Sequence, residues 1–189
     1  MSGEIHVNVG PMYSGKSTEL IRNLTTESSV VSPERILYVN HICDERKTSA
    51  ANKDITTHNI TFSGKTPFHT LKVSKLSDVD VTEYDVIGID EIQFFTNIFL
   101  TILQWKNMGK VIYIVGLDGN SEQETFGGVS SLLPICETFF KLSARCKLCA
   151  QEGKRNARAS FTICNGIKDR EILVGGEEMY SAVCWKHIK

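Results

Sequence analysis

Short apolar runs alternate with amphipathic stretches along the first three quarters of the chain. Four runs rich in β-branched residues predict buried strands over residues 5–9, 35–40, 85–91 and 111–115. Apolar residues recur three and four positions apart between and after these runs, which predicts helices over residues 17–24, 96–108 and 129–136. Strands that alternate with helices favour an α/β fold with a parallel sheet flanked by helices. The stretch from 48 to 79 lacks a strong apolar period and predicts only a mobile segment or a hairpin.

The turn between the first strand and the first helix carries a phosphate-binding motif. Residues 10–17 read Gly-Pro-Met-Tyr-Ser-Gly-Lys-Ser, which fits a glycine, four residues and then Gly-Lys-Ser. In such a loop, backbone N–H groups converge on a phosphate, the lysine reaches the β- and γ-phosphates, and the serine hydroxyl binds Mg²⁺. A glycine-rich turn without a ligand is the alternative, but a chain of this size matches by chance in roughly one case in a hundred. The motif predicts a nucleoside triphosphate as ligand.

Acidic residues stand where other predicted strands end. Asp44 follows the second strand, Asp90 and Glu91 end the third, and the turn 117–119 follows the fourth. The carboxyl ends of parallel strands share one edge of the sheet, so these residues are expected around the ligand. Downstream of a phosphate loop, Asp90 is suited to holding Mg²⁺. Glu91 is either a base that takes a proton from a phosphoryl acceptor, or a helix-capping or solvated carboxylate.

The last fifty residues carry a metal-binding pattern. A Cys-x-x-Cys pair and a Cys-x-x-His pair supply Cys146, Cys149, Cys184 and His187, a spacing suited to tetrahedral Zn²⁺. Four protein ligands leave no open position, so the metal is expected to be structural. Unliganded thiols are the alternative, although neither pair lies in an apolar run. Zinc would tie the ends of the loop 150–183 into a lasso, giving a P-loop domain over 1–140 and a zinc-binding domain over 141–189.

The composition narrows the class of partner and the compartment. The net charge of −1 argues against nucleic acid or an anionic membrane surface as partner. No apolar run approaches the roughly 20 residues that span a bilayer, and a strand is expected to begin at once after residues 1–3, which leaves no room for a signal peptide. Six cysteines without a secretory signal favour a reducing compartment. We therefore expect a cytoplasmic protein that acts on small molecules.

Together these motifs resemble the type II thymidine kinase family, also called the thymidine kinase 1 family. The shared features are the phosphate loop, Asp-Glu-Ile-Gln-Phe-Phe over 90–95, Leu-Asp-Gly over 117–119, Phe126-Gly127, Val-Gly-Gly over 174–176 with Tyr180, and the Cys/His set. They cover nearly the whole chain in order, and the 90–95 signature is far more specific than the phosphate loop. The resemblance implies a RecA-like parallel sheet with a small C-terminal zinc-binding lasso that contributes to the nucleoside site.

The same resemblance implies an activity. It is transfer of the γ-phosphate of ATP to the 5′-hydroxyl of thymidine, and of deoxyuridine, giving dTMP in nucleotide salvage for DNA synthesis. ATP, catalytic Mg²⁺ and structural Zn²⁺ are the implied cofactors. A homotetramer and feedback inhibition by dTTP also fit the resemblance.

Roles carry over position by position. Glu91 matches the catalytic base and Asp90 the Mg²⁺-associated acid, while Lys16 and Arg46 match cations beside the transferred phosphate. The positions expected to contact ATP are Gly10, Pro11, Met12, Tyr13, Ser14, Gly15, Lys16, Ser17, Asp90, Glu91, Ile92 and Gln93. The positions expected around the deoxynucleoside are Met12, Asp44, Phe94, Leu117, Ser121, Phe126, Thr162, Glu171, Ile172, Leu173, Val174, Gly175 and Tyr180. The stretch 171–175 would bind thymine through its backbone.

The chain departs from the family pattern at three points. Ser121 stands where relatives carry an aromatic residue stacked on the base, and loss of that ring is expected to cost about 1 kcal/mol of binding or to relax base choice. The lasso carries a basic insert, 154–158, which is either a solvated surface run or a contact to phosphate or a partner. His187 replaces a cysteine ligand, which Zn²⁺ accepts.

Two other classes of protein share the phosphate loop. A GTPase should show Asn-Lys-x-Asp after a strand, but the nearest match, 52–55, has the acid one place short. A zinc-ribbon P-loop ATPase that binds nucleic acid is the remaining alternative. Only the 154–158 run is basic, and no aromatic platform accompanies it.

Overall fold

A computed structural model describes residues 2–44, 54–55, 64–65, 67–166 and 179–188. Its centre is one six-stranded sheet built from β1 (Glu4–Val9), β2 (Ile36–His41), β5 (His69–Val73), β6 (Val86–Ile89), β7 (Val111–Gly116) and β8 (Thr138–Lys141). The strand order is β5-β2-β6-β7-β1-β8, and every neighbouring pair is parallel. Two strands separate β1 from β2, as expected of the RecA-like sheet, and the phosphate-loop strand β1 lies between β7 and the edge strand β8.

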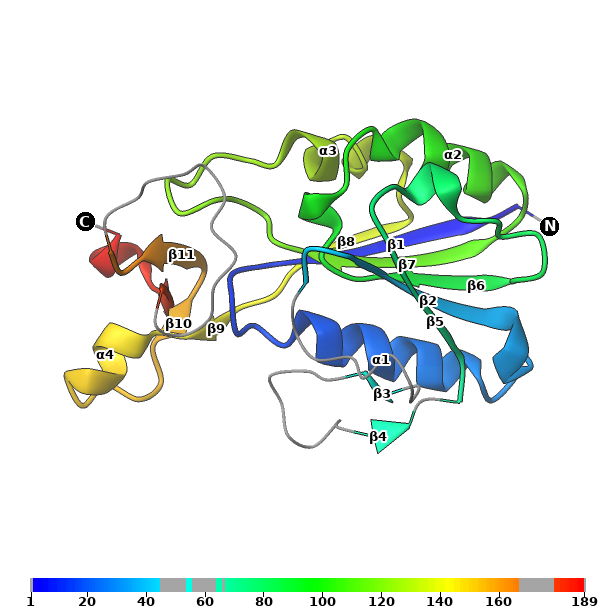
Figure 1. The fold of residues 1–189 in the computed structure, drawn as a ribbon. Helices are drawn as coiled ribbons and strands as arrows, with labels where there is room; N and C mark the ends of the chain where they lie inside the picture. Colours follow the sequence, from blue (N-terminus) through cyan, green and yellow to red (C-terminus); the bar gives the residue numbers. More distant parts are fainter. Residues whose placement is uncertain (1, 45–53, 56–63, 66, 167–178, 189) are drawn as a thin grey trace.

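Helices cover both faces of this sheet (Figure 1). Helix α1 (Lys16–Glu27) lies on one face, and α2 (Ile98–Asn107) with the short α3 (Gly127–Ser130) lies on the other. Alternate strand residues point to opposite faces, so the sheet contributes to two separate apolar clusters, one beneath each helical layer. The predicted α/β fold, with its parallel sheet between helices, is confirmed.

Helix α2 ends at Asn107, two residues before a glycine. Gly109 adopts a left-handed backbone with φ of +82°, which a residue with a Cβ rarely adopts. Its N–H donates to the carbonyl of Lys106 at 2.9 Å, and the N–H of Lys110 donates to the carbonyl of Trp105 at 3.2 Å. This pair of hydrogen bonds is the Schellman motif, which satisfies the last carbonyls of the helix and turns the chain into β7.

Two edge strands and one helix differ from the predictions. Strand β5 lies inside the stretch 48–79, and β8 follows the stretch predicted to be helical. Edge strands have only one neighbour, and all five residues of β5 are exposed or half-buried, so it carries no continuous apolar run. The predicted helix 129–136 is wrong, because α3 stops at Ser130 and only the 3₁₀ turn η5 (Leu133–Ile135) follows. Pro134 lacks an N–H and its ring clashes with the carbonyl four residues earlier, which ends the helix.

The C-terminal residues form a small unit beyond the carboxyl ends of the strands (Figure 1). Its elements are β9 (Ala144–Arg145), α4 (Lys147–Gln151), β10 (Arg158–Ala159), β11 (Phe161–Cys164), β12 (Tyr180–Val183) and η6 (Trp185–His187). It has its own apolar cluster of six buried residues, two of which are Cys146 and Cys149. The unit follows β8, and the N–H of Leu142 donates to the carbonyl of Val9 at 2.7 Å. That hydrogen bond joins it to the end of the phosphate-loop strand.

The remaining short elements connect the larger ones. They are η1 (Pro33–Arg35), β3 (Asp54–Ile55), β4 (Gly64–Lys65), η3 (Leu76–Asp78) and η4 (Ile92–Phe94). Among the described residues, no helix has the length and apolar character needed to cross a membrane.

Candidate active site and metal centre

The phosphate loop joins β1 to α1 at the carboxyl edge of the sheet. Gly15 is the residue before α1 and has a left-handed backbone with φ of +84° and ψ of +18°. A Cβ on Gly10 would lie 2.7 Å from the carbonyl oxygen of Leu142, so the close approach of these two segments requires glycine there. Lys16 is buried, and its Nζ donates to the carbonyl of Pro11 at 2.7 Å. The lysine ammonium is therefore held within the curve of the loop, as phosphate binding requires.

Asp90 is held at both of its carboxylate oxygens. It follows β6, it is 1% exposed, and its Oδ1 accepts a hydrogen bond from the N–H of Glu91 at 2.8 Å. Its Oδ2 accepts from the hydroxyl of Tyr38 on the neighbouring strand at 2.6 Å. The buried carboxylate of Asp90 at this edge and the hydroxyl of Ser17 in the first turn of α1 each offer oxygen donors of the kind that Mg²⁺ prefers.

Glu91 is oriented by a glutamine that links two strand ends. The Nε2 group of Gln93 donates to Glu91 Oε2 at 2.6 Å, and Gln93 Oε1 accepts from the N–H of Leu117 at 2.9 Å. Gly116 makes this possible, because a Cβ there would lie 2.5 Å from Gln93 Oε1. The carboxylate of Glu91 is thus tied through Gln93 to the end of β7.

The geometry also bears on the capping alternative for Glu91. The residue has a left-handed backbone with φ of +51°, and its side chain makes no capping hydrogen bond to η4. Helix α2 begins after Asn97 instead. The carboxylate is half-buried and engaged by Gln93, which disfavours both the capping role and a fully solvated one.

Asp44 lies at the end of β2 in a network of polar and aromatic side chains. The residue is buried, its Oδ2 accepts from Asn40 Nδ2 at 2.6 Å, and its carbonyl accepts from Lys72 Nζ at 2.6 Å. Beside it, the ring of His41 contacts that of Phe94, with centroids 5.8 Å apart. Asp44 and Phe94, both predicted near the nucleoside, therefore flank one strand end.

The C-terminal unit reaches the phosphate loop directly. The N–H of Met12 donates to the hydroxyl of Thr162 on β11 at 3.0 Å, across 150 positions of sequence. Tyr13 packs against the apolar cluster of the C-terminal unit. A second link joins Lys141 to Asp118 at 2.6 Å, with the ammonium 5.1 Å from the centre of the Phe161 ring. Met12 and Thr162, which the family resemblance both placed around the deoxynucleoside, are therefore in contact in the fold.

The four predicted metal ligands converge on one point. The atoms Cys146 Sγ, Cys149 Sγ, Cys184 Sγ and His187 Nδ1 all lie within 4.8 Å of one another. The Sγ atoms of Cys149 and Cys184 are 3.7 Å apart, and the three sulfur-to-Nδ1 distances are 3.4 to 3.6 Å. A tetrahedral Zn²⁺ with ordinary bond lengths sets neighbouring donors about 3.5–3.8 Å apart. The donor set and its spacing fit this ion.

An outer carboxylate orients the histidine ligand. With Nδ1 turned to the sulfurs, Nε2 of His187 faces Glu152 Oε1 at 3.0 Å, the arrangement by which a carboxylate orients a metal-binding imidazole. That contact, with Lys186 and Lys154, lowers the pKa of Glu152 to about 2. Burial would raise the pKa of the Cys146 thiol, but hydrogen bonds from the N–H groups of Cys149 and Cys184 and from His187 lower it to about 6.

Comparison with known proteins gives the family. A family model described as thymidine kinase matches residues 3–188. The thymidine kinases of monkeypox virus, vaccinia virus (strain Tian Tan) and variola virus are each 35% identical to this chain over 189 residues, covering 97% of it and 96% of the viral protein. The chain belongs to the thymidine kinase family. It is accordingly a kinase, an ATP-dependent transferase, and the predicted family resemblance is confirmed.

Three further predicted site residues of this thymidine kinase family member lie away from the carboxylates of Asp90 and Glu91 in the chain, in the loop after β7 and at the start of β12. Ser121 is half-buried, and its carbonyl accepts from the side chain of Gln123 at 2.8 Å. Phe126 packs against the apolar cluster beneath α2, and the half-buried Tyr180 begins β12 opposite Cys164. Arg46 and the stretch 171–175 lie outside the described residues, so their predicted roles stay predictions.

Three residues that hydrogen-bond to predicted site residues could not be recognised from the sequence. Tyr38 lies in an apolar strand. A buried tyrosine hydroxyl usually has a hydrogen-bond partner, but the sequence does not indicate which residue that partner is. Asn40 contacts Asp44 from four positions earlier, and Glu152 reaches His187 from 35 positions away. Neither position carries a spacing that could have indicated its partner.

Gly116→Ala is expected to lower kcat by about 10- to 100-fold, because the methyl group would displace Gln93 and release the carboxylate of Glu91. Steady-state kinetics measure the effect. Gly166→Ala is the matched control, since an added Cβ there meets no described atom within 4 Å. Normal turnover in Gly116→Ala would show that Gln93 does not orient Glu91 for the reaction.

Proposed function

We propose that this protein transfers the γ-phosphate of ATP to the 5′-hydroxyl of thymidine, with Glu91 as the general base. The observation that carries the proposal is the Glu91 carboxylate, oriented by Gln93 at a sheet edge shared with Asp90 and the phosphate loop, in a chain of the thymidine kinase family. A hydroxyl must lose its proton during phosphoryl transfer, and an oriented carboxylate is a suitable acceptor. The other kinase function compatible with this site is transfer to deoxyuridine, which we propose as a second substrate.

The phosphate side of the reaction uses the loop over residues 10–17. Its backbone and the Lys16 ammonium are suited to holding the ATP phosphates, with the stretch 90–93 bordering the same site. Mg²⁺ would be held by the hydroxyl of Ser17 and the carboxylate of Asp90, and when bound it neutralises charge on the β- and γ-phosphate oxygens. Arg46 is proposed to stabilise charge on the transferred phosphate.

The nucleoside side combines both parts of the chain. Met12, Asp44, Phe94 and Leu117 are contributed by loops at the sheet edge, and Thr162 and Tyr180 come from the C-terminal unit. We propose that the stretch 171–175 binds thymine through its backbone. In this proposal residues 1–140 form the ATP-binding domain, and residues 141–189 form a zinc-binding lasso domain that contributes to the nucleoside site. Zn²⁺ at the Cys/His cluster would have a structural role, since all four positions are protein ligands.

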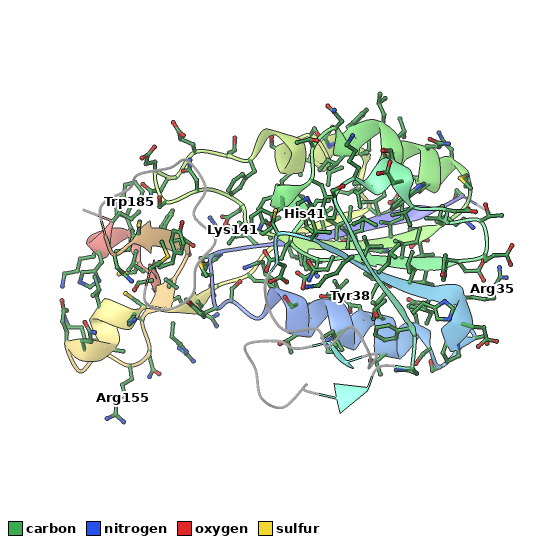
Figure 2. All side chains as sticks on the ribbon, in the orientation of Figure 1. Arg35, Tyr38, His41, Lys141, Arg155 and Trp185 are labelled. Atoms are coloured by element: carbon green, nitrogen blue, oxygen red, sulfur yellow. The ribbon has the colours of Figure 1, made fainter. Side chains whose placement is uncertain are left out.

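Further properties proposed from the family are a homotetrameric assembly, a cytoplasmic location and feedback inhibition by dTTP. The alternative of a nucleic-acid-binding ATPase finds no support in the relatives. Its basic insert is engaged locally at two positions, with Lys154 near Glu152 at 3.3 Å and Arg158 donating to Ser143 at 2.8 Å. Arg155 points away from the protein (Figure 2), consistent with a solvated surface run.

The test is phosphorylation of thymidine, deoxyuridine, deoxycytidine, deoxyadenosine and deoxyguanosine, each incubated separately with the purified protein, ATP and Mg²⁺. Thymidine should be phosphorylated, deoxyuridine more slowly, and the purine deoxynucleosides not at all. Equal turnover of deoxycytidine or a purine deoxynucleoside would contradict the proposed substrate. A gel-shift assay with single-stranded DNA at physiological salt distinguishes a nucleoside kinase from a nucleic-acid-binding ATPase. A nucleoside kinase should not shift the DNA.

Ser121→Phe is expected to tighten thymidine binding by roughly 0.5–1.5 kcal/mol, the range for a favourable aromatic pair. The physical reason is that phenylalanine restores an aromatic ring at the position where relatives carry a ring stacked on the nucleoside base. Calorimetric titration with thymidine measures the change, and Ser121→Leu controls for added apolar surface without a ring. Unchanged or weaker binding would mean that another group already fills this part of the base pocket.

A further inference from the structure

Tyr38 is a buried residue without a role in the proposed mechanism. It lies on β2 and is 3% exposed, and its ring belongs to the apolar cluster formed with Leu20, Ile21 and Leu24 of α1. Figure 2 shows the side chain between the sheet and α1. The register pairs Tyr38 with Gly88 on β6, two residues before Asp90. The ring is therefore fixed by packing, and its hydroxyl is directed along the neighbouring strand toward the carboxyl edge.

The hydroxyl of Tyr38 ends on Asp90. The distance from its oxygen to Asp90 Oδ2 is 2.6 Å, and both residues are buried. The backbone of Asp90 is fixed as well, because its N–H donates to the carbonyl of Val39 at 2.9 Å. With Oδ1 held by the N–H of Glu91, the side chain is anchored at both oxygens, so rotation about its Cβ–Cγ bond would break two hydrogen bonds.

We propose that Tyr38 is a positioning residue that presents the Asp90 carboxylate to the Mg²⁺ bound with ATP. Hydrogen bonds from outside a metal site orient its ligands and tune their affinity. The inference rests on the proposed function in so far as Asp90 is the Mg²⁺-side acid. The competing explanation is purely structural, that a buried phenol needs any acceptor. The two differ in one respect: a positioning role weakens the Mg²⁺-dependent part of ATP binding, whereas a structural role affects stability alone.

The experiment measures ATP binding by calorimetry with Mg²⁺ and, separately, with a chelator in place of Mg²⁺. Tyr38→Phe keeps the ring and removes only the hydroxyl. We expect the gain in ATP affinity produced by Mg²⁺ to fall about 10-fold in this variant, while the affinity without Mg²⁺ is unchanged. In steady-state kinetics the half-saturating Mg²⁺ concentration should rise by a similar factor, with a smaller change in kcat at saturating Mg²⁺.

A matched control lies on the same face of the sheet. Tyr113 on β7 donates to Glu27 Oε1 at 2.6 Å, at the end of α1 away from the phosphate loop. Tyr113→Phe removes an equivalent tyrosine–carboxylate hydrogen bond, so it should leave the Mg²⁺ dependence as in the parent protein. In an Asp90→Asn background, Tyr38→Phe should produce no further loss, because the hydroxyl acts through that carboxylate.

Three results would overturn the proposal. The first is an unchanged Mg²⁺ effect in Tyr38→Phe, the second is an equal loss of ATP affinity with and without Mg²⁺, and the third is a full Tyr38→Phe effect in the Asp90→Asn background. Because binding is measured with ATP alone, a failure of the protein to phosphorylate thymidine would overturn the proposed substrate and leave this test intact.

Discussion

Glu91→Gln lowers kcat by about 10²- to 10⁴-fold while ATP and thymidine still bind. Glutamine keeps the size of the side chain and a carbonyl that accepts from Gln93 Nε2, so the local structure should persist. What it removes is the group that takes the proton from the 5′-hydroxyl. Rapid-quench or steady-state kinetics give kcat, and calorimetry gives the two affinities.

The adjacent carboxylate supplies the control. Asp90→Asn should raise the Mg·ATP requirement as well as slow the transfer, because Asp90 is proposed to stand on the metal side and is 1% exposed. The two variants therefore differ in which kinetic parameters change. Glu91→Gln should lower kcat alone, whereas Asp90→Asn should also raise the Mg²⁺ and ATP concentrations needed for half-saturation. Near-normal turnover in Glu91→Gln with unchanged affinities would mean that Glu91 is not the base, and Asp44 or solvent would have to accept the proton.

Loss of the metal centre is expected to have the largest effect on the folded C-terminal unit. Structural Zn²⁺ can contribute on the order of 10 kcal/mol, comparable with the whole stability of a domain. Among the described residues, the apolar cluster of this unit has six buried members, and two of them are predicted metal ligands. Cys146→Ser, or removal of the metal with a chelator, should therefore abolish thymidine binding. ATP binding should fall only in part, because Met12 and Tyr13 contact this unit, whereas Lys16 lies in α1 and its ammonium is held by the carbonyl of Pro11 within the loop itself.

Metal analysis and calorimetry test this expectation. The active protein should contain one zinc per chain, and thymidine binding should return when Zn²⁺ is added back to the chelated protein. Cys136→Ser is the matched control, since this half-buried cysteine lies outside the cluster and its Sγ contacts the carbonyl of Leu133. Active protein with well under one zinc per chain would contradict a structural metal.

The features that the sequence determined are those encoded over short distances. The phosphate loop, the acids that end β6 and the paired Cys/His spacings each depend on a few adjacent residues, and β1, α1 and α2 follow from local apolar periods. Strand β5 and the early end of helix α3 were not predicted, because the local apolar pattern does not encode them. An edge strand needs no continuous apolar run, and Pro134 overrides a helical pattern that otherwise looks regular.

The tertiary structure decided how these pieces work together. The strand order brings β2 beside β6, which allows the hydroxyl of Tyr38 to reach Asp90, and it brings β7 beside β6, which allows Gln93 to bridge Glu91 and Leu117. Thr162 likewise reaches the phosphate loop across 150 positions. A local period fixes which face of a strand is buried but contains no information about which strand lies next to it. The orientation of the Asp90 and Glu91 carboxylates, which are proposed to act in catalysis, therefore depends on neighbours that only the folded sheet provides.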